Sequence, residues 1–138
     1  MTLKKDNKGF TLMEMLIVVA IIAILIAIMI PVFNAQLEKS REAADAANIR
    51  SAYAQVMVGY LEGDTDATST VTLTQQTDGW EKDSTYADTF TKLVGEKGSV
   101  TGSPTAKGSC TVSVDKDGNA TIAFGTASSS SSSTSTGN

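Results

Sequence analysis

The pattern of hydrophobic and polar positions divides the chain into an apolar N-terminal segment and a mainly polar remainder. Residues 10–33 are almost entirely hydrophobic, and residues 15–30 contain no polar side chain. A helix rises about 1.5 Å per residue, so residues 10–33 would span about 36 Å, more than the roughly 30 Å hydrocarbon core of a bilayer. The length and the missing turn residues favour a helix over a strand. We therefore predict a transmembrane helix at residues 10–33.

The helix is expected to continue through residues 34–63, which are rich in the good helix formers Ala, Glu, Gln and Arg. Four apolar or aromatic residues at i, i+4, i+7 and i+11 share one face: Ile49, Tyr53, Val56 and Tyr60. This face is expected to pack on a small domain. The charged residues before it are expected to form a solvated stretch: Glu38, Lys39, Arg41, Glu42 and Asp45. Gly63 predicts the helix end, and Pro31, which lacks a backbone N–H, predicts a helix kink.

Residues 64–125 are predicted to form a small head domain. Three segments alternate between hydrophobic and polar residues, which is typical of short strands: 70–74, 110–114 and 120–124. The dipeptide Asp117-Gly118 predicts a hairpin between the last two strands.

One further helix is predicted between the first two of these strands. Asp83 or Ser84 can cap its N-terminus, and apolar residues at helical spacing extend it to about Val94. Residues 95–109 contain five Gly or Pro and are interpreted as a loop. The expected fold class is α+β, with a long N-terminal helix packed on a small antiparallel sheet.

Charge is segregated along the chain. Residues 1–9 carry three Lys and one Asp, a net charge of +2, which leaves 8 basic and 14 acidic side chains (net −6) in the rest of a chain of net charge −4. The basic flank predicts a single-pass membrane precursor with a cytoplasmic N-terminus. The serine-rich residues 126–138 have almost no apolar content to offset the entropy of ordering, so a disordered tail is expected.

The composition excludes several kinds of site. The chain has no His, which rules out a His-based triad, and its one Cys, Cys110, rules out an intramolecular disulfide. Cys110 is expected to be a small buried residue. Asp115, Asp117 and Asn119 have the spacing of the first ligands of a calcium loop, but the glycine is misplaced and no downstream Glu completes the set. A plain hairpin turn is expected there, with no metal and no cofactor.

Glu14 is the one charged residue inside the apolar segment. A carboxylate in a membrane span costs about 2.5–3.5 kcal/mol at mid-depth, so a plain single-span anchor gives no reason for it. A buried core helix is disfavoured because the mostly polar remainder could not cover it on all sides, and a secretory signal because the apolar run is too long and no A-x-A-like site follows it. Residues 10–33 contain no Lys, Arg or His that could pair with Glu14. Cleavage after Gly9 would give Phe10 a free α-amino group one helical turn from Glu14. The chain's own terminus or that of a neighbouring subunit could then neutralise the carboxylate.

Residues 8–14, with the sequence KGFTLME, and the long apolar run after them resemble the class III signal of type IV pilins and pseudopilins. The resemblance covers about residues 8–33. It implies that prepilin peptidase cuts between Gly9 and Phe10, removes the leader 1–9 and N-methylates Phe10. It also implies that Glu14 acts in subunit assembly.

The resemblance implies a structural subunit rather than an enzyme. The precursor is expected to lie in membrane lipid and then to polymerise through its N-terminal helix into a helical homo-oligomer, the type IV pilus. Prepilin peptidase and the pilus assembly platform with its ATPase are the expected partners, and no direct nucleic-acid binding is expected.

The extracellular filament is expected to serve adhesion, twitching motility or DNA uptake. A pseudopilin of a type II secretion or competence apparatus and a membrane-anchored binding module are the alternatives. Many Gram-negative pilins close a C-terminal loop with a disulfide. Because this chain has a single Cys, a Gram-positive bacterial source is favoured.

Overall fold

The computed structural model describes residues 9–82 and 84–126. Three parts about which the sequence makes predictions lie outside the described residues: positions 1–8 of the leader, the candidate helix cap Asp83, and positions 127–138 of the tail. The chain divides into two compact units, residues 1–36 (the N-terminal unit) and residues 37–138 (the head unit).

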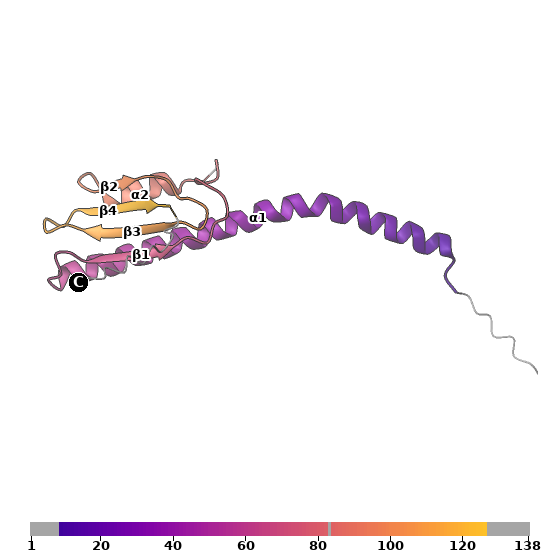
Figure 1. Ribbon diagram of the computed structural model, residues 1–138, viewed down its shortest axis with the longest axis horizontal. Coiled ribbons are helices and arrows are strands. Elements are labelled where there is room, and N and C mark those ends of the chain that lie inside the picture. The colour runs from indigo at the N-terminus through magenta and orange to yellow at the C-terminus, as the bar shows by residue number, and fades with distance from the viewer. Residues whose placement is uncertain (1–8, 83, 127–138) are drawn as a thin grey trace, which may run out of the picture. The chain divides into compact units, whose positions relative to one another are not determined.

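The longest element is helix α1, Leu12–Leu61, in which the apolar and amphipathic segments form one helix (Figure 1). Its C-terminus has a hydrogen-bonded cap. The Gly63 N–H donates to the Tyr60 carbonyl at 3.1 Å, and the Asp64 N–H donates to the Gly59 carbonyl at 2.9 Å. Gly63 has a φ of 105°, a conformation that favours glycine. The predicted helix end at Gly63 is therefore confirmed.

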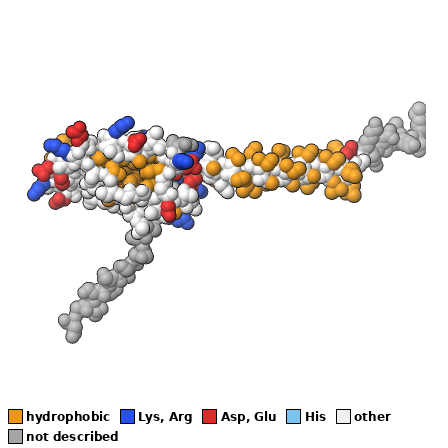
Figure 2. All heavy atoms as spheres, turned by 90° about the horizontal axis from the view of Figure 1, so that it is seen from above, with side chains coloured by type: hydrophobic (Ala, Val, Ile, Leu, Met, Phe, Trp, Pro, Cys, Tyr) orange, Lys and Arg blue, Asp and Glu red, His pale blue; other side chains and the backbone are white. Residues whose placement is uncertain are grey.

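In the N-terminal unit, every described residue from Gly9 to Gln36 is exposed. Figure 2 shows hydrophobic side chains covering the visible face of this part of α1. Pro31 lies within α1, whose helical assignment continues on both sides of it. The kink predicted at Pro31 stays a prediction.

A four-stranded sheet forms one side of the head unit. Its strands are β1 (Thr68–Thr72), β2 (Ser99–Thr101), β3 (Ser109–Val114) and β4 (Ala120–Gly125), in the spatial order β1-β3-β4-β2. The β1–β3 and β3–β4 pairs are antiparallel, and β3 and β4 form the hairpin predicted from Asp117-Gly118. The three predicted strands are therefore present, with the first shifted by two residues.

The sheet is mixed, and the expectation of a purely antiparallel sheet is wrong. Strand β2 pairs with β4 in parallel, and it lies inside residues 95–109, which were expected to be a loop. A strand of three residues is too short to show an alternating pattern, and the flanking Gly98 and Gly102 give a turn signal instead. The α+β class is confirmed.

Helix α2, Tyr86–Val94, lies between β1 and β2 in the chain, as predicted. Its N-cap is Thr85, whose side chain makes no capping hydrogen bond, so Ser84 is not the cap. The Thr89 N–H donates to the Thr85 carbonyl at 2.9 Å. The helix thus begins one residue later than it would with Ser84 as its N-cap. The other candidate cap, Asp83, lies outside the described residues.

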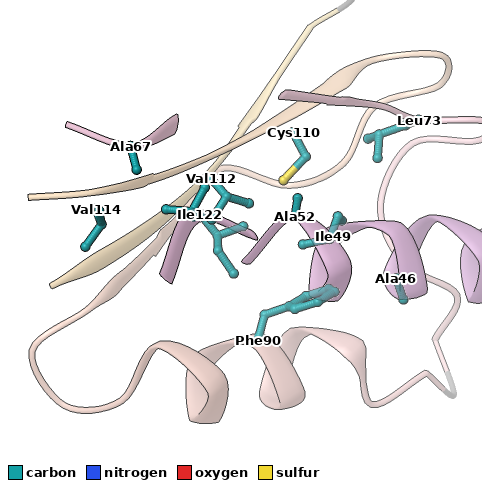
Figure 3. Packing of buried hydrophobic residues seen from close by; sticks show 11 residues of the cluster. Ala46, Ile49, Ala52, Ala67, Leu73, Phe90, Cys110, Val112, Val114 and Ile122 are labelled. Carbon is teal, nitrogen blue, oxygen red and sulfur yellow. The ribbon is translucent and has the colours of Figure 1, made fainter. Parts of the chain in front are cut away.

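The core of the head unit lies between α1, α2 and the inner face of the sheet. Figure 3 shows Ile49 of α1, Phe90 of α2 and Ile122 of β4 pointing toward a common centre, and all three are fully buried. The predicted packing face of α1 is confirmed, because Ile49 and Val56 are buried with Tyr53 and Tyr60 packed against the cluster. Cys110 is also fully buried, as expected, and burial raises the pKa of its thiol to about 12.

Candidate functional site

The predicted cleavage junction lies just before the start of α1. Gly9, Phe10 and Thr11 are non-helical, and the side chain of Phe10 is 82% exposed. A Cβ added at Gly9 would meet no atom within 4 Å. The fold therefore does not require glycine at position 9, and a requirement for it would lie with whatever acts on the Gly9–Phe10 bond.

Glu14 and Thr11 form a reciprocal pair at the N-terminus of α1. The Thr11 N–H donates to Glu14 Oε2 at 2.7 Å, and the Glu14 N–H donates to Thr11 Oγ1 at 3.2 Å. This is a capping box, in which two N–H groups that the helix leaves without partners are both satisfied. Satisfying these groups matters most in lipid, where water cannot replace the missing partners.

The capping box gives Glu14 a partner within the uncut chain, which the sequence reasoning missed. That reasoning considered only a free amine or another molecule as partner. The T-x-x-E pattern of residues 11–14 is a signature of the capping box and could have revealed it. Cleavage between Gly9 and Phe10 would leave the Thr11 amide in place and would add an ammonium group four residues before Glu14.

A second feature is a row of three acidic side chains on α1: Glu38, Glu42 and Asp45, here called the carboxylate row. Their exposed fractions are 6%, 1% and 0%, so the expected solvated stretch is wrong at these three positions. The row lies at i, i+4 and i+7, and Ile49 and Val56 continue the same helix face. That shared face is the sequence signal that could have revealed the burial.

The carboxylate row is buried because it binds the segment between β1 and α2. Asp45 accepts hydrogen bonds from the Thr74 N–H (2.9 and 2.8 Å), the Thr74 hydroxyl (2.8 Å) and the Gln75 N–H (2.9 Å). Glu38 accepts from the Gln76 N–H, and from the N–H and hydroxyl of Thr77 at 2.9 and 3.0 Å.

The third member of the row has fewer partners. Glu42 accepts a single N–H group, that of Glu81, which lies 2.9 Å from Oε1 and 3.1 Å from Oε2 of Glu42. Burial raises the pKa of Glu42, and the nearby carboxylates of Glu81 and Glu38 act in the same direction. Burial would also raise the pKa of Glu38, but its hydrogen bonds from Gln76, Thr77 and Arg41 together hold that pKa below its ordinary value.

The three candidate calcium ligands form the hairpin turn between β3 and β4. Asp115 Oδ1 accepts the N–H groups of Asp117 (2.9 Å) and Asn119 (2.8 Å), and Oδ2 accepts the Asn119 side-chain amide at 2.9 Å. These hydrogen bonds, first that from the Asn119 side chain, lower the pKa of Asp115. The Asp115 carboxylate therefore stabilises the turn itself. Within residues 9–82 and 84–126, no three Cys, Asp or Glu side chains gather as a metal site.

Comparison with known proteins adds one finding. A family model described as the prokaryotic N-terminal methylation motif matches residues 4–30. The match includes Gly9, Phe10, Thr11 and Glu14, together with most of the apolar segment. Searches of curated proteins and of solved structures give no match.

Proposed function

We propose that this chain is the precursor of a pilus filament subunit. The premise is that residues 4–30 carry the class III signal of type IV pilins and pseudopilins. The motif supports a pilin-like or pseudopilin-like precursor, anchored in a bacterial membrane, that prepilin peptidase processes for a pilus-type assembly machinery. The proposed product is an extracellular type IV pilus, with a structural rather than an enzymatic role.

The observation that carries this proposal is the exposed apolar surface of α1 in the N-terminal unit. One helix among the described residues is long and apolar enough to cross a membrane, and none of its most apolar stretch is buried within the chain. Such a surface is stable in lipid or against other apolar helices. A shallow hollow of about 340 Å³ on this helix would accept side chains of another helix, and it is lined by Leu25, Ile26, Met29, Ile30, Phe33 and Asn34.

Two simpler functions for the apolar segment fit less well. A secretory signal peptide is removed at its apolar end, whereas α1 continues from this segment to Ile49 and Val56 in the core of the head unit. Cleavage there would interrupt one continuous helix. A plain anchor would not need the methylation motif at residues 4–30.

The proposed mechanism stores subunits in the membrane and then moves them into a helical bundle. Moving an apolar helix from lipid to protein buries no new surface from water, so the gain comes from packing and from pairing of polar groups. After cleavage, the Phe10 ammonium of one subunit and the Glu14 carboxylate of a neighbour would attract each other strongly in a medium of low dielectric constant. Repeated contacts that do not close into a ring would then produce a filament.

The test uses two substitutions at Glu14, because the capping box and the charge are separable. Glu14→Gln keeps a side-chain oxygen that can cap the Thr11 N–H but removes the charge, and Glu14→Ala removes both. We expect both variants to be cleaved after Gly9 and to form no filaments in electron micrographs of sheared surface material. Glu62→Gln, at an exposed residue beyond the C-terminus of α1, is the control and should give normal filaments.

Each result has a clear meaning. Filaments of normal length and number from Glu14→Ala would refute the assembly role of Glu14. Normal filaments from Glu14→Gln alone would show that capping suffices and that the charge is not needed. Gly9→Val should block cleavage, and mass spectrometry that finds a mature chain starting at methyl-Phe10 in that variant would refute the requirement for glycine at position 9. Short rods in place of long surface filaments would indicate a pseudopilin.

A further inference from the structure

Residues 74–81, here called the strap, connect β1 to α2 along the carboxylate row. Five backbone amides of the strap donate to the three carboxylates: those of Thr74, Gln75, Gln76, Thr77 and Glu81. The two ends are held differently. Glu38 and Asp45 together bind four consecutive amides at the first end, whereas Glu42 binds the single Glu81 amide at the second end.

We propose that the two ends of the strap respond to protons in opposite directions: a proton on Glu42 fastens the Glu81 end, and a proton on Glu38 releases the end at Gln76 and Thr77. The different number of hydrogen-bond donors that each carboxylate receives is the basis of this proposal. A carboxylate that receives several N–H and O–H donors is stabilised in its charged form, and one that is buried with a single donor is stabilised in its neutral form.

Glu42 is buried and receives a single donor, so its neutral form is stabilised. Its side chain is 1% exposed, and it faces the carboxylates of Glu81 and Glu38. Lys39 opposes them, but its ammonium pairs with Glu81 at 3.6 Å. A solvent-open cavity of about 260 Å³ beside Glu42 gives protons a path to it, and it is lined by Lys39, Glu42, Glu81, Ser84, Thr85 and Tyr86. Asp83, which precedes Ser84, lies outside the described residues.

Linkage gives the direction of the effect at Glu42. While the strap is fastened, burial and the neighbouring carboxylates raise the pKa of Glu42 more than the Glu81 N–H and Lys39 lower it. The fastened state therefore binds the proton more tightly than the released state. The fastened state is therefore favoured as the pH falls from neutral through the raised pKa. The full gain is reached below the ordinary glutamate pKa of about 4.3.

Glu38 receives several donors, so its charged form is stabilised. Beyond the Gln76 and Thr77 donors, its Oε2 accepts from Arg41 at 3.2 Å. Its pKa is lowered in the fastened state, so its contribution is complete above the ordinary value of about 4.3 and is lost as the pH falls through the lowered value. The remaining carboxylate of the strap, Asp78, is directed to the Ala106 N–H at 2.7 Å and thus away from the row.

The test is hydrogen exchange of individual backbone amides, measured by NMR on the full chain in detergent micelles between about pH 7 and pH 3. Protection is corrected for the intrinsic pH dependence of exchange. Each unit of pKa difference between the fastened and released states changes local protection about tenfold. We expect protection of the Glu81 amide to rise between pH 7 and about 4.3, and protection of the Gln76 and Thr77 amides to fall below about 4.3.

Variants separate this local response from global unfolding. Glu42→Gln should remove the rise at Glu81 and leave the other end unchanged, whereas Glu38→Gln should lower protection at Gln76 and Thr77 already at pH 7. Glu62→Gln is the matched exposed control and should follow the native chain. Three results would overturn the proposal. Protection could fall at both ends of the strap together, it could be pH-independent at the Glu81 amide, or it could fall in parallel in β3 and β4.

Discussion

Asp45 offers the sharpest test of how the head unit is held together, because its side chain is fully buried and accepts three donors. In Asp45→Asn, one carboxylate oxygen becomes an NH₂ group that faces N–H donors. The substitution would therefore remove at least one charge-assisted hydrogen bond, and an NH₂ group in place of Oδ2 would leave the buried Gln75 N–H without its acceptor. Hydrogen bonds to charged groups contribute about 1.5–3 kcal/mol, and an unpaired buried donor costs about 1–3 kcal/mol. We expect a loss of about 2–4 kcal/mol in the free energy of unfolding of the head unit.

The assay is urea unfolding of the full chain in detergent micelles, followed by tryptophan fluorescence. Trp80 is the single tryptophan of the chain, and it lies in the strap with its ring centroid 5.2 Å from that of Tyr86. With a urea dependence of about 2 kcal/mol per molar, the expected loss shifts the midpoint by about 1–2 M. Asp66→Asn makes the same chemical change at an exposed residue and should stay within about 0.5 kcal/mol of the native chain. An equal midpoint for both variants would refute the proposed contribution of Asp45.

Three further outcomes follow from the same structure. Gly63→Ala forces a side chain into a φ of 105° and should lower the free energy of unfolding by about 1 kcal/mol in the same assay. Cys110, buried with a pKa of about 12, should react with iodoacetamide at pH 8 at least about a hundredfold more slowly in the folded chain than in urea, and equal rates would contradict its burial. Because the pKa of Glu38 is lowered in the folded chain, the stability advantage of the native chain over Glu38→Gln should be constant above pH of about 4.3 and shrink as the pH falls further. A constant difference down to about pH 2 in urea titrations would contradict that contribution.

Much of the fold could be predicted from local patterns. An uninterrupted apolar run has few alternatives to a helix, and Gly63 and Asp117-Gly118 mark conformations that other residues adopt at a cost. These signals depend on neighbouring residues in the chain. Strand β2 carries no such signal, because its three residues form a strand only by pairing with β4.

The carboxylate row shows why the remaining features could not be predicted with the same ease. Helical spacing places Glu38, Glu42 and Asp45 on one face, but the spacing alone cannot distinguish a solvated face from a buried one. The answer depends on amides about thirty to forty residues further along the chain. Glu14 is different, because its partner Thr11 lies three residues away and a local motif could have identified it.

The carboxylate row explains how the chain can pass from β1 to α2 without a further strand. Strand β1 ends at Thr72, and the N–H groups of residues 74–77 donate to no strand. A buried N–H without a partner is costly, so packing these amides against a purely apolar helix face would be unstable. Asp45 and Glu38 on α1 provide acceptors in place of the missing strand. The path of the strap, and with it the position of Trp80 against α2, is therefore set by side chains of α1 and not by the sheet alone.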